Sequence, residues 1–331
     1  MDTGTHVVMG IGLGGFALLD PVVAQSPVTA EAVLTGTLIG SLVPDFDTIF
    51  KLKNNATYIR QHRGTSHSIP AMLIWPLAIV GAISIFIPNA EGLHLWLWTF
   101  AAVVLHVFVD IFNAYGTQAL RPFSNKWIAL GIINIFDPVI FFTHAAGIAV
   151  WFFGLGPPGF TFLTVYIILF FYYIWRIFVH NRLMEQIKAE VPDAEYVNVS
   201  PNFRWNRWHI SIQTPEQFHV AEASRNGIIV FDTYKRQPLP DTPVLRTVQQ
   251  DENVKAFLAF SPIFRWEKTE YPHYDEVRFI DLRYRDKDGH YPFVAIVLID
   301  REQHIVSSFT GWVHSEDKLQ KKLKPATNLN G

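Results

Sequence analysis

Histidine and aspartate residues recur near the ends of the apolar stretches of this sequence. His106 and Asp110 are four residues apart, so a helix places both on one face with their Cβ atoms about 6 Å apart. Asp45 and Asp47 flank Phe46, and in an extended segment both carboxylates would point the same way. Because the chain has no cysteine, any metal must be bound by nitrogen and oxygen ligands.

Two further histidines, His62 and His67, flank an Arg-Gly-Thr-Ser sequence whose turn would bring both imidazoles inward. His6 lies near the start of the first apolar stretch. Mixed His and Asp ligation without thiolate suits divalent zinc, manganese or iron, and the number of carboxylates favours two or more ions. The predicted metal ligands are His6, Asp45, Asp47, His62, His67, His106 and Asp110.

The apolar stretches predict membrane-spanning helices, because about 20 mostly apolar residues cross the hydrocarbon of a bilayer. We expect about six, the first two short and rich in glycine, so that these form a tight hairpin or one of them is re-entrant. The expected spans cover residues 5–19, 31–43, 69–89, 93–113, 132–153 and 160–180.

The charges of the connections predict the orientation of these spans. Lys and Arg gather in residues 45–68, 114–131 and 181–188, whereas 89–92 and 154–159 have none. Because Lys and Arg accumulate on the cytoplasmic side, both termini are expected in the cytoplasm. All seven candidate ligands, and Asp137, then lie at the cytoplasmic face. Each residue alone has an ordinary explanation, as a helix cap or a topology determinant, but together they predict a metal site.

The charged residues are unevenly distributed along the chain. Residues 1–180 hold 8 of the 29 Asp and Glu and 7 of the 27 Lys and Arg. The sequence therefore predicts an α-helical polytopic membrane domain at 1–182 and a cytoplasmic, mainly antiparallel α+β domain at 183–331. The net charge of −2 argues against nucleic-acid binding by phosphate neutralisation.

Short β-branched or alternating runs predict the strands of the second domain. Asp288-Gly289 indicates a hairpin turn, and residues 244–260 are typical of helix. The expected strands cover residues 196–199, 208–212, 228–231, 277–284, 293–299 and 304–309.

Residues 1–180 resemble the bacterial membrane-bound metal-dependent hydrolases, a family that includes LexA-regulated inner-membrane members. The resemblance implies an inner-membrane location and metal-dependent hydrolysis. The order of His and Asp on helices is also similar, more loosely, to zinc-dependent phospholipase C and related single-strand nucleases, which favours phosphoester cleavage. The motifs that carry the first resemblance are residues 2–6, Pro44-Asp45-Phe46-Asp47, residues 62–68, His106 with Asp110, residues 113–117, residues 121–124 and Asp137-Pro138.

If the cluster binds metal, Asp137 is the candidate general base and Arg63 the candidate ligand of an anionic head group. The position at the membrane face favours a membrane lipid or a membrane-associated substrate. The alternatives from other classes are a divalent-metal transporter and a non-enzymatic scaffold or sensor. A transporter should have polar residues along a path near mid-membrane, whereas this sequence gathers them at one edge.

Overall fold

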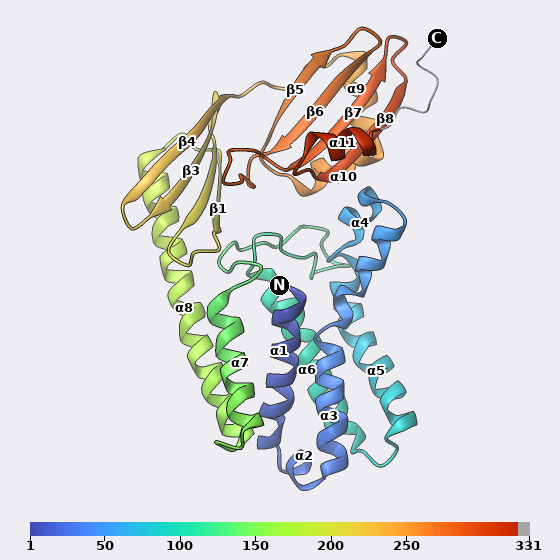
Figure 1. Cartoon of the computed structure of the whole chain (residues 1–331), viewed down its shortest axis with the longest axis vertical. Coiled ribbons are helices and arrows are strands. Elements are labelled where there is room, and N and C mark those ends of the chain that lie inside the picture. The colour runs from blue at the N-terminus through green and yellow to red at the C-terminus, as the bar shows by residue number, and fades with distance from the viewer. Residues whose placement is uncertain (324–331) are drawn as a thin grey trace. The chain divides into compact units, whose positions relative to one another are not determined.

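The computed structural model describes residues 1–323, which form two compact units (Figure 1). The helical unit comprises Met1–Asp47, His62–Ile187 and Ser200–Asn206. The sheet unit comprises Thr48–Gln61, Lys188–Val199 and the chain from Arg207 onward. The main stretch of the helical unit thus runs to Ile187, beside an expected boundary at residue 182, and the sheet unit also takes a segment from the middle of the helical sequence.

Helices make up most of the helical unit (Figure 1). They are α1 (Thr3–Phe16), α2 (Pro21–Gln25), α3 (Pro27–Gly40), α5 (Ile69–Phe86), α6 (Gly92–Ile111), α7 (Pro138–Phe152) and α8 (Pro158–Glu190), with the 3-10 helices η1 (Ala17–Leu19), η2 (Val43–Leu52) and η3 (Thr65–His67).

Four of these helices begin with the same local signal. Asp20, Ser26, Ser68 and Asp137 each cap a helix by accepting a hydrogen bond from a backbone N–H of its first turn. Each is followed by proline at the first or second helical position, where the missing N–H would have no helical partner. The sequence thus fixes where α2, α3, α5 and α7 start.

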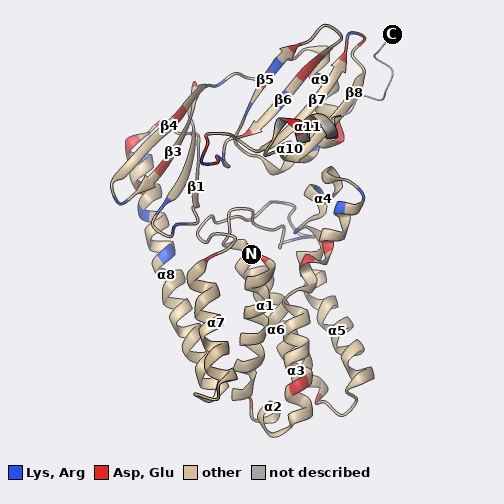
Figure 2. Cartoon of the chain, viewed as in Figure 1, with Lys and Arg blue, Asp and Glu red and all other residues tan. Residues whose placement is uncertain are grey.

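Three helices, α5, α6 and α8, are long and apolar enough to cross a membrane. The helix α3 meets the same criterion only when joined to η2, from which it is bent by 41°. The helices α1 and α7 are apolar but shorter, and they, like α5, carry no charged residue (Figure 2). By length and composition the described chain therefore has three candidate spans, or four with the bent pair, where the sequence predicted about six.

The shortfall at α7 has a specific cause. The predicted span began at residue 132, but Asp137 caps the helix and sets its start at Pro138. The carbonyl of Ile132 is bound instead by the buried guanidinium of Arg176, with Nε at 3.1 Å and Nη2 at 2.9 Å. The residues before the cap are thus held in a loop by a side chain of α8.

Glycines allow close approach between the helices. A Cβ atom on Gly15 of α1 would lie 2.4 Å from the ring of Phe162, a fully buried residue of α8. By contrast, a Cβ atom on Gly81 of α5 would meet nothing within 4 Å. The contact between α1 and α8 therefore requires glycine at position 15, whereas the exposed face of α5 has room for a side chain at position 81.

The sheet unit holds two antiparallel four-stranded sheets in the orders β1-β2-β3-β4 and β5-β6-β7-β8. The remaining helices of the unit are α4 (Asn55–Gln61), α9 (Pro243–Gln250), α10 (Glu252–Phe260) and α11 (Glu316–Lys322). The strands are β1 (Tyr196–Pro201), β2 (Trp208–Gln213), β3 (Gln217–Ser224), β4 (Gly227–Lys235), β5 (Phe264–Glu270), β6 (Tyr274–Asp281), β7 (Phe293–Asp300) and β8 (Ile305–Trp312).

The second sheet is covered on both faces, which explains the continuous apolar run of β7. Phe293 and Val297 face α9 and α10, where they pack with Phe257. Ile296 and its neighbours on the opposite face pack with Leu319 of α11. Because alternate residues of a strand point to opposite faces, burial on both sides requires apolar residues at every position.

The six predicted strand regions all contain strands, and β6 and β7 pair as expected around Asp288-Gly289. The strands β3 and β5 were missed; four of the seven residues of β5 are charged, and its last three are exposed. The predicted helical region is two helices, because Asp251 ends α9 and caps α10 through the N–H groups of Asn253 and Val254.

The helix α4 joins the sheet unit through side-chain contacts. The amide of Asn55 donates to the backbone oxygen of Thr310 in β8 at 3.0 Å, and Ile59 packs against the core beside α10. This contact was not predicted, because residues 48–61 were expected to be only a connection between two spans.

Gly15→Ala is expected to destabilise the helical unit by about 1–3 kcal/mol, because the added methyl group must displace the ring of Phe162. Gly81→Ala is the matched control, with an expected change within about 1 kcal/mol and in the stabilising direction. Thermal unfolding of the purified protein in detergent measures both. Equal midpoints for the two variants would show that α1 and α8 do not pack as described.

Candidate metal centre

Four segments of the helical unit meet at one cluster of histidines and aspartates. The structure brings together all seven residues that the sequence predicted as metal ligands. They come from α1 (His6), η2 (Asp45 and Asp47), the segment between α4 and α5 (His62 and His67) and α6 (His106 and Asp110).

Asp45, His67, His106 and Asp110 form an inner group, whose ligand atoms all lie within 4.8 Å of one another. The Nε2 atoms of His67 and His106 are 3.2 Å apart. Both Nε2 atoms are 3.7 Å from Oδ1 of Asp45. The Nε2 atom of His67 is 3.5 Å from Oδ2 of Asp110, and that of His106 is 3.6 Å from the same oxygen. A tetrahedral zinc ion with bonds of about 2.0–2.1 Å separates its ligand atoms by about 3.3–3.4 Å. The inner group therefore fits one such ion.

Hydrogen bonds outside the inner group determine which nitrogen of each imidazole faces it. Nδ1 of His106 lies 2.7 Å from the backbone oxygen of Ser41, an acceptor, so this nitrogen carries the proton. The hydroxyl of Ser66 donates to Asp47 and accepts from Nδ1 of His67 at 2.9 Å. In both neutral rings the lone pair is therefore on Nε2 and points into the inner group.

The inner group is buried, with His67, His106 and Asp110 at most 1% exposed and Asp45 19% exposed. Oδ1 of Asp45 and Oδ2 of Asp110 have no hydrogen-bond partner. Such oxygens are strongly destabilising unless a cation compensates them. Burial holds the pKa of His67 well below its usual range, which keeps this ring neutral and able to bind a metal.

Asp45 also belongs to an outer group with Asp47 and His62, whose ligand atoms lie within 4.8 Å of one another. Oδ1 of Asp47 is 2.6 Å from Nδ1 of His62, and Oδ2 accepts from the backbone N–H of Arg63 at 2.8 Å. Both oxygens of Asp47 therefore have partners already. The outer group has the composition to hold a second ion. Through Asp47 it also positions Arg63 and Ser66 beside the inner group.

The segment of Asp45 and Asp47 is the 3-10 helix η2, whereas an extended segment was expected. The N–H of Asp45 donates to the carbonyl of Leu42 at 3.1 Å, the i to i+3 bond of such helices. Residues two apart on a helix do not face each other. This is why Asp45 reaches the inner group while Asp47 turns to His62.

His6 lies beside the inner group, against the second oxygen of Asp110. Its ring stacks on that of His106, with centroids 3.8 Å apart, and its Nε2 is 3.6 Å from Oδ1 of Asp110. The amino group of Met1 contacts Nε2 of His6 at 2.9 Å and donates to Oδ1 of Asp110. Asp110 therefore joins His6 to the inner group with one oxygen on each side.

Arg63 is fixed at the same place by an uncommon backbone conformation, with φ at +58°. Its Nη2 atom lies 3.4 Å from Oδ2 of Asp110 and 3.3 Å from the backbone oxygen of Met1. Together with the bond from its N–H to Asp47, these contacts hold the strained turn. The guanidinium thus adjoins the inner group, as an anion-binding role requires.

Asp137, the predicted general base, lies outside both groups. Oδ1 accepts from the N–H groups of Val139 and Ile140 at 3.0 and 3.3 Å, and Oδ2 accepts from the hydroxyl of Tyr172 at 2.8 Å. Its carboxylate is therefore engaged in capping α7 and binding α8.

Three groups that the sequence reading did not include complete the surroundings: the backbone oxygen of Ser41, the hydroxyl of Ser66 and the amino group of Met1. Ser66 lies between His62 and His67 in the sequence, so its position could have predicted a contact with these histidines. A backbone oxygen leaves no signal in sequence, and neither does an amino group placed by the turn before α1.

A second histidine–carboxylate pair lies at the other end of α6. Nδ1 of His94, in the first turn, is 2.6 Å from Oδ2 of Asp20, which also accepts from Trp98. No third candidate ligand joins this pair among the described residues. Since α6 carries both this pair and the cluster at its last turns, a variant of His94 can serve as a control for variants of the cluster.

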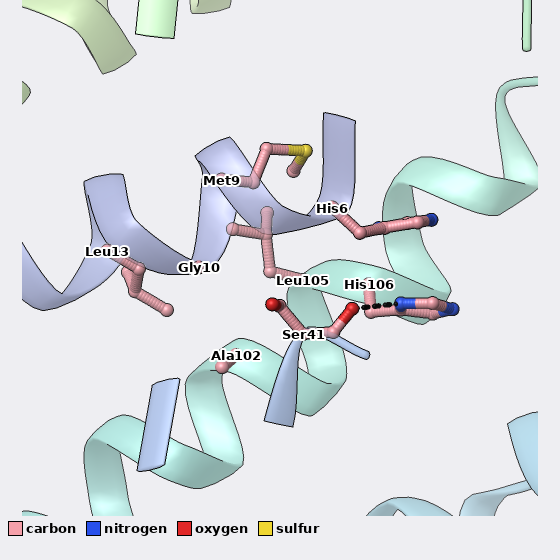
Figure 3. Close-up of a pocket in the computed structure, with 8 residues that line it drawn as sticks. All are labelled: His6, Met9, Gly10, Leu13, Ser41, Ala102, Leu105 and His106. Atoms are coloured by element: carbon pink, nitrogen blue, oxygen red, sulfur yellow. Dashed lines mark hydrogen bonds between the residues drawn. The ribbon is translucent and has the colours of Figure 1, made fainter. Parts of the chain in front are cut away.

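A narrow space adjoins the cluster and extends between α1, α3 and α6 (Figure 3). Figure 3 shows His6 beside His106, whose Nδ1 atom is hydrogen-bonded to the backbone oxygen of Ser41. The side chains of Met9 and Leu105 line the same space. The histidines are thus bordered directly by apolar side chains of the helix interior.

Residues 1–183 match a family model described as the YdjM inner membrane protein. Beyond them, residues 192–234 match the YfhP middle domain and residues 243–323 the YfhP C-terminal alpha/beta plait domain. The sequence predicted one domain where these two models match.

A protein of Bacillus subtilis (strain 168), described as the uncharacterized protein YfhP, is 55% identical over 325 residues, or 98% of this chain and 99% of that protein. No solved structure matches the chain. The family description agrees with the expected inner-membrane location and names no reaction. The apolar helices and these matches lead to one conclusion: the chain belongs to the YdjM inner membrane protein family.

Proposed function

We propose that this protein is a membrane-embedded, metal-dependent hydrolase acting on phosphoester or lipid-type substrates at the cytoplasmic face. The observation that carries the proposal is the inner group, where two imidazole lone pairs and two carboxylate oxygens without hydrogen-bond partners converge at tetrahedral spacing. The ion that suits two nitrogens and two oxygens at this spacing is zinc, with manganese or iron as alternatives. The outer group supports a second ion.

The chemistry of the site follows from its residues. A bound divalent ion lowers the pKa of water and stabilises negative charge on a phosphoryl or acyl oxygen. Asp45 is the only member of the inner group with appreciable exposure, so water and substrate approach past its carboxylate. A catalytic zinc ion keeps one of its four positions for water, so we assign it three ligands, His67, His106 and Asp110. The carboxylate of Asp45 would then accept the proton of the attacking water, because Asp137 already accepts three hydrogen bonds.

Arg63 binds the anionic part of the substrate in this proposal. Its guanidinium is held beside Asp110, and its planar donors match phosphate or carboxylate oxygens. Asn113 keeps Asp110 in place by donating to Oδ1 at 3.1 Å while accepting from the N–H of Gly116 at 2.9 Å. Such indirect contacts fix the orientation of ligands.

The proposed topology has about six membrane segments, with α1 and α7 inserted although they are short, and both termini in the cytoplasm. Lys and Arg in the connections after η2 and after α6 support this orientation. The connections α5–α6 and α7–α8 contain neither.

His67→Ala and Asp110→Asn are expected to lower the zinc content of the purified protein at least about ten-fold, because each removes a ligand atom of the inner group. His94→Ala, which removes the partly buried imidazole–carboxylate pair at the other end of α6, is the control and should retain the metal. Elemental analysis by mass spectrometry measures all three. Unchanged zinc in both ligand variants would refute the assignment.

Hydrolysis of a panel of phospholipids and generic phosphoesters tests the activity. Arg63→Lys keeps the positive charge but loses the paired donors, so kcat/KM should fall about ten-fold or more at unchanged metal content. Arg63→Gly allows the same left-handed backbone conformation but removes the guanidinium altogether, and should be at least equally impaired. Metal binding without any hydrolysis by the unmodified protein would favour a metal transporter or a scaffold instead.

Cysteine labelling tests the topology, since the chain has no cysteine of its own. Asn125→Cys, on an exposed residue after α6, should react with an impermeant maleimide only once the membrane is opened. Asn89→Cys, exposed between α5 and α6, should react in intact cells. The opposite pattern would invert the proposed orientation.

A further inference from the structure

The loop between α6 and α7 presents two large apolar side chains at its outer end. Residues 120–126 form this end, the loop tip, where Phe123 is 84% exposed and Leu120 is 48% exposed. Lys126 is exposed beside them. By contrast, Thr117 at the base of the loop is fully buried. The loop therefore turns its apolar residues outward at the tip instead of burying them.

Hydrogen bonds hold the loop in one conformation. The backbone groups of Thr117 and Ile128 bond to each other in both directions, at 3.0 and 2.9 Å, and close the base of the loop. At the tip, the N–H of Phe123 donates to the carbonyl of Leu120 at 2.9 Å, which makes a tight turn. The two apolar side chains are thus displayed by an ordered turn.

The loop is also fastened to the segment that leads into α5 and carries two of the candidate metal ligands. The N–H of Gln118 donates to the carbonyl of Arg63 at 2.9 Å. Nη1 of Arg121 donates to the hydroxyl of Thr65 at 3.2 Å. The loop tip is therefore joined to the surroundings of the metal centre through this segment.

A further hydrogen bond sets the level of the loop tip relative to a membrane. The N–H of Ile69, the first residue of α5, donates to the carbonyl of Arg121 at 3.2 Å. The helix α5 is a candidate span of 18 residues. Such a helix is about 27 Å long, and the hydrocarbon of a bilayer is about 30 Å thick. Crossing it requires all of α5, so Ile69 lies at the hydrocarbon boundary, and the loop tip lies there too.

The apolar surface of α5 continues from this level. Leu73 and Ile74, about one turn beyond Ile69, are both exposed. In a bilayer crossed by α5, these side chains contact acyl chains. Phe123 and Leu120 then extend the same lipid-contacting surface to the boundary with the head groups.

The charge of the loop specifies which lipids suit it. Residues 111–136 contain Arg121 and Lys126 and no Asp or Glu. Basic residues at a membrane surface attract anionic phospholipids, and apolar side chains beside them insert at the boundary between head groups and acyl chains. A bilayer with anionic lipids supplies phosphate and hydrocarbon at the same level, which matches both features of the loop tip.

We infer that the loop tip inserts Leu120 and Phe123 into the bilayer and binds the phosphate of an anionic phospholipid through Arg121 and Lys126. That such a lipid reaches the metal centre as its substrate rests on the proposed function. The insertion itself does not, because none of the candidate metal ligands lies in this loop.

Fluorescence in full-length protein measures the depth of the loop tip. Because the chain has no cysteine, Phe123→Cys carries a single NBD fluorophore. In vesicles of phosphatidylcholine and phosphatidylglycerol, its emission should shift to shorter wavelength. Phosphatidylcholine with a nitroxide near the start of its acyl chain should quench it at least about two-fold more than the same label on Asn226→Cys. Asn226 is the control, since it is exposed in the turn between β3 and β4.

Two outcomes of this measurement would overturn the inference. Equal quenching of both labels by aqueous iodide would place the loop tip in water. A shift to shorter wavelength without quenching by the lipid nitroxide would show that protein, such as a second copy of this chain, covers the loop tip.

Binding of phosphatidylglycerol tests the basic residues. Lys126→Gln and Arg121→Gln should each weaken it about five-fold, as native mass spectrometry of the full-length protein measures, with phosphatidylcholine binding unchanged. Arg121→Lys keeps the charge and should bind like the unmodified protein, which separates the charge from the bond to Thr65. Lys287→Gln, at an exposed position of the sheet unit, is the control. Unchanged binding in both glutamine variants would refute the phosphate contact.

Phe123→Ser separates this inference from the proposed hydrolase. Hydrolysis of a lipid in vesicles should fall about ten-fold, whereas hydrolysis of a soluble phosphoester should be unchanged, because Phe123 is no part of the metal centre. If the loop tip inserts and binds phosphatidylglycerol but the protein hydrolyses nothing, only the proposed function fails. If a soluble phosphoester is hydrolysed and the loop tip stays in water, only the present inference fails.

Discussion

The buried carboxylates of the helical unit impose the constraint on which its remaining structure depends. Asp45, Asp47 and Asp110 lie at one place in an apolar bundle, and their charge must be compensated there. Arg63 supplies part of that compensation through Asp110. The partners of Asp47 satisfy both its oxygens, but the oxygen that Asp45 turns to the imidazoles has no hydrogen bond. The cluster therefore has the composition of a candidate cation site.

Positions of single residues in the helices bring the ligands to this place. The cap at Ser68 starts α5 directly after His67, and the α6 spacing puts Asp110 one turn beyond His106. The lack of a side chain at Gly15 lets α8 approach α1, the helix that carries His6. These are local rules of capping and packing, and each can be traced to one or two residues. Their combined effect is a cluster whose members are drawn from positions 6 to 110 of the chain.

The sequence predicted the membership of the cluster because loop charges and ligand positions agreed on one face of the helices. It could not predict the local path of η2, since the alternating pattern of Asp45 and Asp47 fits an extended segment as well as a helical turn. The second oxygen of Asp137 is occupied by the hydroxyl of Tyr172, which lies 35 residues away in sequence. Likewise, α4 joins the sheet unit by a bond to a backbone oxygen in β8, and no pattern of side chains records that partner. Where prediction failed, the deciding partner was a backbone group or a distant residue.

The facing imidazoles give the clearest indication of what completes the centre. Both donate from Nδ1 to outside acceptors, so both Nε2 atoms present lone pairs to each other at 3.2 Å. Two lone pairs at that distance repel unless something positive lies between them. One added proton would make an imidazolium that bonds to the other ring, but it would leave the oxygens of Asp45 and Asp110 only partly neutralised. A divalent ion, as the proposed function requires, would accept lone pairs from both imidazoles and from Asp110, and its charge would also compensate Asp45. A proton and a metal ion thus compete for the same atoms, and the carboxylates favour the ion with the greater charge.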